Sequence, residues 1–168
     1  ACELAGFDTV KAEVREMTRD EAIILMVESN LQRSVILPSE KAFSYKMRLE
    51  AMKRQAGRPS QDNYSPLGNN SFGTKSSDEM AAEVGESKNT IFRYIRLTEL
   101  IPELLDLVDE GRIAFRPAVE LSYLQKEEQS ALFEQISYAD ATPSLAQAIK
   151  LKRFSQDGKL NNEVIESI

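Results

Sequence analysis

The hydrophobic and polar positions between residues 76 and 100 describe two short helices separated by a tight turn. The apolar stripes of these two helices consist of Met80, Ala81, Val84, Ile91 and Ile95. Gly85 should end the first helix, because glycine readily adopts the left-handed conformation that helix ends require. Ser87 can cap the second helix. This layout is typical of a DNA-binding helix-turn-helix, although an ordinary helical hairpin with a solvated polar side has the same spacing.

The polar side of the second helix carries long hydrogen-bond donors. The side chains predicted to point outward are Lys88, Asn89, Arg93 and Arg96. Arginine and lysine can pair with guanine, and asparagine with adenine, in the major groove of DNA. The span from residue 88 to residue 96 has a net charge of +3 and no acidic residue. A helix that enters the major groove would need side chains of this kind.

Further elements are predicted on both sides of this pair. Alternating residues from Thr9 to Arg15 predict a half-buried strand. Capping-box spacing and a dense apolar run predict a well-buried helix from Thr18 to Asn30. A longer helix, Ser39 to Ala56, should bury the face that contains Ala42, Tyr45, Leu49 and Met52, and leave Arg48 and the other cations solvated or along a phosphate backbone. Later helices are expected over Pro102–Glu110, Phe115–Leu124, Lys126–Tyr138, Ser144–Phe154 and Asn161–Ile168.

A change in composition divides the chain into three parts. Glycine, proline, serine and asparagine dominate from residue 57 to residue 75, where no hydrophobic period is present. This stretch predicts a flexible linker. We therefore expect a first domain over residues 1–57, a linker over 58–75 and a helical domain over 76–168. The expected fold class is mainly α.

Composition excludes several classes of function. The 168 residues include one cysteine and no histidine, so disulfide frameworks, Ser-His-Asp catalysis and imidazole metal sites are excluded. No apolar run is long enough for a membrane span, and a reducing cytoplasm is the expected compartment. The net charge is −6, but residues 30–58 have a net charge of +5. The basic character of the chain is therefore concentrated in that segment and in the second helix of the pair.

Three stretches in order resemble the ParB family of centromere-binding partition proteins, in the variety found on plasmids and mobile elements. The stretch ACELAGFDTVKAEV is similar to the end of the family's nucleotide-binding helix and the strand after it. The stretch SNLQRS, followed by LPSEKAFSYK, is similar to the family's second conserved box. The stretch from Asp78 to Phe115 is similar to the family's helix-turn-helix and the next helix. We interpret the chain as a central fragment of such a protein.

This resemblance implies residue roles. The residues that match the DNA-binding side of the family are Ser87, Lys88, Asn89, Thr90, Arg93, Arg96 and Arg116. Asn30 would help to hold Mg²⁺ and the triphosphate of CTP, and Arg33 would contact phosphate. Ser29 stands where relatives usually have glutamate. Residues 1–57 would be the C-terminal part of the family's α/β nucleotide-binding domain, and the helical domain would bind DNA.

The resemblance also implies partners and alternatives. The full-length protein would bind a double-stranded DNA palindrome as a homodimer, close into a CTP-dependent clamp and work with a ParA-type Walker ATPase in the cytoplasm, on the nucleoid. A CTPase activity would belong to that full-length protein, whereas this fragment is expected to bind DNA without catalysis or cofactor. The alternatives are a transcriptional regulator on the same core, a ParB-like nuclease and a protein-docking helical module. A nuclease would need converging carboxylates, which the sequence lacks.

Overall fold

Local sequence signals define the first two helices of the computed structural model, which describes residues 9, 11, 13–31, 36–55 and 72–166. Helix α1 spans Arg19–Leu31. It begins at a capping box, because the Thr18 backbone N–H donates to Glu21 at 2.7 Å and the Glu21 N–H donates to the Thr18 hydroxyl at 3.3 Å. Helix α2 spans Pro38–Gln55, with proline in its first turn, where the missing N–H costs nothing.

The predicted helix-turn-helix is confirmed. Helix α3 spans Phe72–Val84 and helix α4 spans Lys88–Leu97. Gly85 has φ +67°, the left-handed conformation expected at this turn. Ser76 and Glu79 have capping-box spacing, which predicts a helix that starts at Ser76, but α3 begins at Phe72, four residues earlier. Such spacing lowers the cost of starting a helix, but it does not prevent the preceding residues from extending it.

Five further helices complete the described chain. They are α5 (Pro102–Asp109), α6 (Phe115–Leu121), α7 (Lys126–Ala139), α8 (Leu145–Gln156) and α9 (Asn162–Glu166). Their order agrees with the predicted helices, with ends shifted by a few residues. Gly111 turns the chain after α5 with φ +75°. A capping box formed by Ser144 and Gln147 begins α8.

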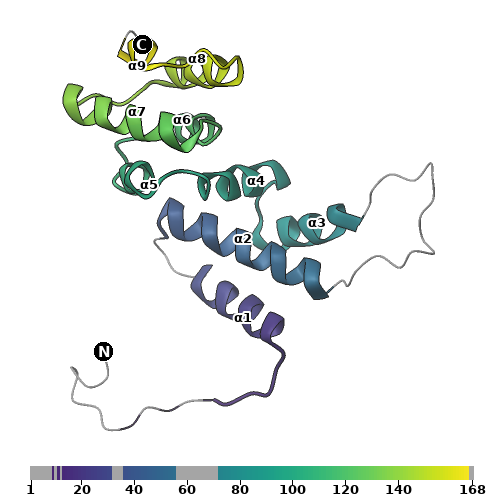
Figure 1. The fold of residues 1–168 in the computed structure, drawn as a ribbon. Coiled ribbons are helices and arrows are strands. Elements are labelled where there is room, and N and C mark those ends of the chain that lie inside the picture. Colours follow the sequence, from purple (N-terminus) through teal and green to yellow (C-terminus); the bar gives the residue numbers. More distant parts are fainter. Residues whose placement is uncertain (1–8, 10, 12, 32–35, 56–71, 167–168) are drawn as a thin grey trace, which may run out of the picture.

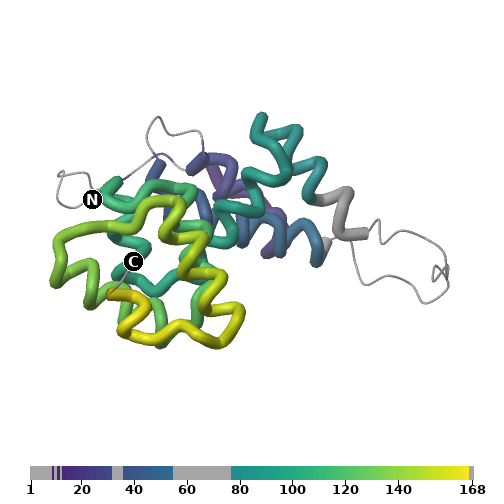
Figure 2. The backbone as a smooth tube through the Cα atoms, turned by 90° about the horizontal axis from the view of Figure 1, so that it is seen from above, coloured from purple at the N-terminus to yellow at the C-terminus, as the bar shows by residue number. Residues whose placement is uncertain are grey.

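The helices are stacked along one direction (Figure 1). Helix α1 lies at one end, α2 beside it, then α4 and α5, then α6 and α7, and finally α8 and α9. Seen from above, the helices from α5 onward gather into one group, and α1–α3 extend away from it (Figure 2). One hydrophobic cluster joins α4–α9, and a second joins α2, α3 and α4 through Tyr45, Leu49, Met80 and Ile91.

Helix α2 contacts both clusters. The face predicted for burial is confirmed, since Ala42 and Tyr45 are 0% exposed and Leu49 is 5% exposed. Ala42 belongs to the larger cluster, whereas Tyr45 and Leu49 belong to the smaller one. Helix α2 therefore packs against helices beyond the predicted linker, although the domain boundaries themselves remain predictions. Most of that linker lies outside the described residues, and residues 72–75 are helical.

Two sequence predictions near the N-terminus are wrong. The described residues between Thr9 and Arg15 form no strand, and Val14 is 93% exposed. An alternating segment forms a strand only where a neighbouring strand completes its backbone hydrogen bonds, and the described part of the chain offers none. Helix α1 is also less buried than predicted, because Leu25 and Met26 are 44% and 47% exposed. Helix α1 packs mainly on α2, so one side of its apolar run stays uncovered.

Arg48 is buried rather than solvated, in contrast to the sequence prediction. Its side chain is 4% exposed and forms ion pairs with Glu28 of α1, at 2.8 Å, and with Glu83 of α3. Arg48 therefore connects three helices. None of the described helices has the length and apolar character needed to cross a membrane.

Removing both glutamates should destabilise the fold more than removing Arg48. The Glu28→Gln/Glu83→Gln variant leaves a buried guanidinium charge without a carboxylate, which should cost about 3 kcal/mol. Arg48→Met keeps most of the side-chain volume and leaves two glutamates that are 42% and 55% exposed and stay hydrated. We expect it to cost about 1 kcal/mol. Urea unfolding of both variants measures the two losses, and the reverse order would contradict this assignment.

Candidate nucleic-acid interface

Backbone and side-chain bonds fix the start of α4. Ser87 adopts an extended conformation, and its hydroxyl accepts the Thr90 N–H at 3.1 Å. The Ser87 and Thr90 hydroxyls also lie 2.8 Å apart. The predicted cap is therefore confirmed. Since the free N–H groups of a helix N-terminus attract anions, this fixed start is a suitable place for a DNA phosphate.

The exposed side of α4 presents an amide and a guanidinium one turn apart. Asn89 and Arg93 are both exposed, as predicted. Within the described ranges, neither side chain has a hydrogen bond or an ion pair to another residue. Phe92 lies next to them and is 43% exposed, which the sequence pattern did not indicate. These side chains are available to contact base edges.

Lys88 is less available than predicted. Its ammonium lies 3.1 Å from the Asp78 carboxylate of α3, and its side chain is 33% exposed. An ion pair of this kind is weak in solvent. Lys88 would nevertheless have to leave Asp78 to contact a phosphate.

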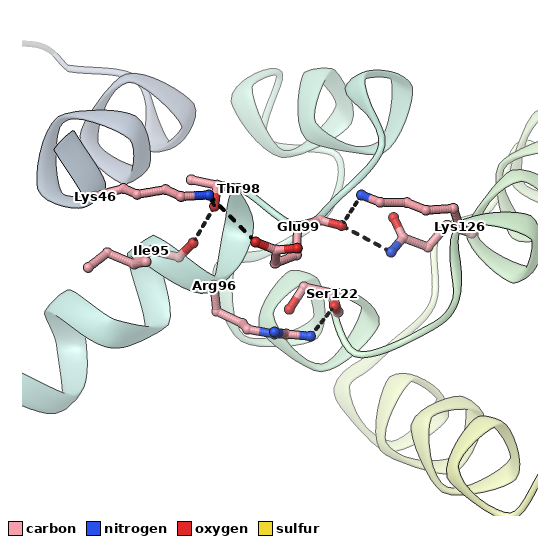
Figure 3. Close-up of polar contacts among 8 residues, drawn as sticks. Lys46, Ile95, Arg96, Thr98, Glu99, Ser122 and Lys126 are labelled. Atoms are coloured by element: carbon pink, nitrogen blue, oxygen red, sulfur yellow. Dashed lines mark hydrogen bonds and ion pairs between the residues drawn. The ribbon is translucent and has the colours of Figure 1, made fainter. Parts of the chain in front are cut away.

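Arg96 was predicted to point outward, but its side chain is directed at the residue after α6 (Figure 3). Its guanidinium donates to the Ser122 carbonyl at 2.7 Å. The guanidinium also lies 4.1 Å from the centre of the Tyr123 ring. Both partners follow α6, far along the sequence from α4. Arg96 therefore connects the end of α4 to the end of α6, and helical spacing within α4 alone could not reveal these contacts.

Arg116 lies at the start of α6 and is exposed, with no hydrogen bond or ion pair to the rest of the described chain. The preceding residue, Phe115, contacts Tyr94 of α4, and their ring centres are 4.5 Å apart. This contact holds the start of α6 against α4. Arg93 precedes Tyr94 in the sequence and Arg116 follows Phe115, so each arginine is next to one of the two contacting rings.

A groove of about 580 Å³ runs beside α4. Its lining includes Asn89, Phe92, Arg93 and Arg96 from α4, and Tyr123 from the turn after α6. Glu99, which also lines the groove, lies 3.6 Å from the Lys46 ammonium (Figure 3). Tyr123 is a groove residue that the sequence reasoning missed, because no motif marks it.

A second ion pair holds the turn before α4. Lys41 of α2 pairs with Glu86, and its ammonium lies 4.8 Å from the centre of the Tyr94 ring. Burial lowers the pKa of Lys41, but the hydrogen bond to Glu86 and the interactions with Tyr45, with the Glu86 charge and with Tyr94 together outweigh burial and leave that pKa raised. Lys41 is therefore a positioning residue for the turn. Burial also raises the pKa of the neighbouring Tyr45 to about 12.

The residues predicted to bind nucleotide are only partly described. The Asn30 side-chain N–H donates to the Met26 carbonyl at 2.9 Å, and its amide oxygen has no partner among the described residues. Arg33 lies outside the described residues. Among the residues that the structure describes, no group of three or more cysteine, aspartate or glutamate side chains could hold a metal ion.

A family model described as the ParB HTH domain matches residues 70–153, which is half of the chain. The chain belongs to the ParB family. The match contains all of α3–α7 and most of α8. The family assignment made from the sequence is therefore confirmed, together with a helical fold that contains the helix-turn-helix.

Three relatives have names that concern partitioning. The chromosome-partitioning protein Spo0J of Thermus thermophilus is 29% identical over 75% of this chain and 39% of its own length. A probable chromosome 1-partitioning protein ParB of Deinococcus radiodurans is 26% identical over 94% of the chain and 47% of its own length. A probable chromosome-partitioning protein ParB of Coxiella burnetii is 25% identical over 77% and 38%. The chain spans less than half the length of each relative.

Tyr45 should make the fold sensitive to alkaline pH. In the unfolded chain its hydroxyl ionises near pH 10, whereas in the fold it ionises near 12. The unfolded state thus loses its proton first, so stability from this group is complete below pH 10 and falls as the pH rises toward 12. Tyr45→Phe should remove that part of the loss. The free energies of unfolding of both proteins in urea at pH 8 and pH 11 measure it.

The Tyr45→Phe variant also serves as its own control at pH 8. The buried Tyr45 hydroxyl has no hydrogen-bond partner in the described part of the chain. Its removal should therefore change stability by no more than about 1 kcal/mol. An identical alkaline loss in the two proteins would show that Tyr45 ionises equally easily in the folded and unfolded states.

Proposed function

We propose that this chain is the DNA-binding part of a chromosome-partitioning protein and that it recognises duplex DNA through α4. The observation that carries the proposal is the pair Asn89 and Arg93, exposed without partners in the described chain on a capped helix of a ParB-type helix-turn-helix. The names of the three relatives support the partitioning role. The regulator, nuclease and docking alternatives gain no specific support.

The proposed contacts follow from geometry and charge. Helix α4 enters the major groove, where Arg93 would pair with guanine and Asn89 with adenine. The anion-attracting start of α4 and the exposed Arg116 would contact phosphates. The protein has a net charge of −6, so non-specific attraction to DNA should be weak. Selectivity would then depend mainly on base-edge contacts.

Several finer features extend the proposal to a protein of full family length. These are a palindromic target bound by a homodimer, a ParA-type ATPase partner, a CTP-dependent clamp and a location on the nucleoid. Family resemblance is their support. The predicted origin on a plasmid or mobile element remains a prediction, because the three relatives have chromosomal names.

A site for CTP and Mg²⁺ would need residues beyond those described. The amide oxygen of Asn30 has no partner among the described residues, but one amide oxygen does not make a Mg²⁺ site. The described residues alone therefore do not fit CTP and Mg²⁺. Calorimetry with CTP and Mg²⁺ on this chain and on a full-length relative would test whether nucleotide binding requires the parts of the relative that this chain does not span.

Selection from a pool of randomised duplexes tests the proposed function directly. The 168-residue chain should enrich one sequence, and that sequence should contain two inverted half-sites if a dimer binds. Fluorescence anisotropy over a salt series would then give the affinity for the selected duplex and for a scrambled control. If no sequence is enriched, the proposed function is wrong.

Arg93→Ala should weaken binding to the selected duplex by about 1–3 kcal/mol and relax the preference at one base position. The reason is the loss of a bidentate contact to guanine. Lys159→Ala is a matched control, because Lys159 is also exposed and lies beyond α8. Repeating the selection with each variant checks both effects. Unchanged base preference for Arg93→Ala would exclude Arg93 as a base-reading residue.

Asp78→Asn should strengthen binding, because it frees Lys88 to contact a phosphate. One more phosphate contact should steepen the slope of log affinity against log salt by about 0.9. Glu79→Gln removes the same charge from an exposed neighbour on α3 that has no ion pair to any described residue. Anisotropy titrations of the two variants should show the steeper slope only for Asp78→Asn. The same slope for both would attribute the effect to net charge.

A further inference from the structure

Three side chains form a row from the end of α4 to α8. The Arg96 guanidinium carbon lies 4.1 Å from the centre of the Tyr123 ring, and the Lys152 ammonium lies 3.8 Å from the same centre. Cations are attracted to the faces of aromatic rings, so both hold the ring in place. We refer to these three residues as the Arg96–Tyr123–Lys152 row.

The Tyr123 side chain is available for an additional contact. It is 41% exposed and lines the groove beside Asn89 and Arg93. Its hydroxyl has no hydrogen-bond partner in the described ranges. A free hydroxyl donor is thus held next to the proposed base-reading residues.

Lys152 also keeps hydrogen-bonding capacity. Its ammonium donates to the Glu120 carboxylate at 2.8 Å, and its side chain is 25% exposed. An ammonium has three N–H donors, so one ion pair does not exhaust it. The adjacent Arg153 is exposed, although residues 99–168 as a whole have a net charge of −6. Lys152 and Arg153 therefore form a locally basic segment within an acidic region.

The position of the row matches the edge of a bound major groove. Helix α4 has ten residues and is about 15 Å long. The major groove is about 12 Å wide, so a helix lying across it brings its ends near the phosphate strands. Arg96 lies in the last turn of α4, and the row begins there.

We propose that the Arg96–Tyr123–Lys152 row is a second DNA contact, which binds the phosphate backbone beside the groove that α4 occupies. This inference rests on the proposed function and extends it. The Tyr123 hydroxyl and the Lys152 ammonium donate to phosphate oxygens. Arg96 is a positioning residue, which fixes Tyr123 through its ring contact and its bond to the Ser122 carbonyl.

Binding to duplexes of two lengths distinguishes a direct DNA contact by Tyr123 and Lys152 from a purely structural role of these residues. The selected duplex is prepared with long flanks and also trimmed until only the α4 contacts remain. Lys152→Ala and Tyr123→Phe should weaken binding to the long duplex and leave binding to the trimmed duplex unchanged. Tyr123→Phe keeps the ring between the cations, so it tests the hydroxyl without disturbing the fold, and should cost about threefold in affinity.

Salt dependence and a matched lysine complete the test. Loss of one phosphate contact should make the defect of Lys152→Ala about threefold larger at 50 mM salt than at 200 mM salt. Lys150→Ala is the control, because Lys150 is exposed about 160° around α8 from Lys152 and faces away from the row. It should bind the long duplex almost as the unchanged protein does.

Other results would overturn the inference. Equal losses on the long and trimmed duplexes, reproduced by Glu120→Gln, would mean that Lys152 acts only by holding α8 on α6. Wild-type affinity of both Lys152→Ala and Tyr123→Phe for the long duplex would also exclude the contact, while leaving the α4 proposal intact. Failure of the unchanged chain to enrich any duplex would overturn both proposals together.

Discussion

The contact of α2 with the helix-turn-helix is the interaction on which the rest of the arrangement depends. Helices α3 and α4 are short, and a pair of short helices cannot bury its apolar side alone. Tyr45 and Leu49 of α2 cover Met80 and Ile91 and so complete that core. The same helix places Lys41 against Glu86 in the turn before α4. The orientation of α4, the proposed recognition helix, is therefore set largely by α2, which lies outside the matched ParB HTH domain.

Local signals in the sequence predicted the elements of the site well. The conformation of Gly85 and the cap at Ser87 depend on residues within one turn of the chain, so their spacing was sufficient to predict them. The buried face of α2 was predictable for the same reason, because its apolar residues repeat at the helical period. Alternation alone could not predict whether the N-terminal segment forms a strand, since a strand depends on partner strands that its own alternation does not specify.

The predictions failed where a long side chain finds a distant partner. Arg48 and Arg96 both occupy positions that helical spacing alone assigns to solvent. Arg48 instead meets Glu28 and Glu83, and Arg96 meets the residues after α6. A guanidinium on a flexible stem can reach across to a neighbouring helix, so its environment is set by tertiary packing. Periodicity shows which side of a helix is polar, but it does not show which polar groups are already engaged.

Because Arg96 and Lys88 are already engaged, fewer side chains of α4 are available for the proposed DNA recognition. With Arg96 committed to α6 and Lys88 paired to Asp78, the predicted donors of α4 that remain available for the proposed base contacts are Asn89 and Arg93, the second and sixth of its ten residues. In helix-turn-helix proteins the first residues of the recognition helix make the base contacts. The last turn of α4 has a structural role, because Arg96 in that turn holds α6 against α4. Because α6 in turn packs against α8, these later helices are fixed relative to Asn89 and Arg93, the proposed base-reading residues. A phosphate contact made from those later helices would therefore constrain the angle at which α4 enters the groove.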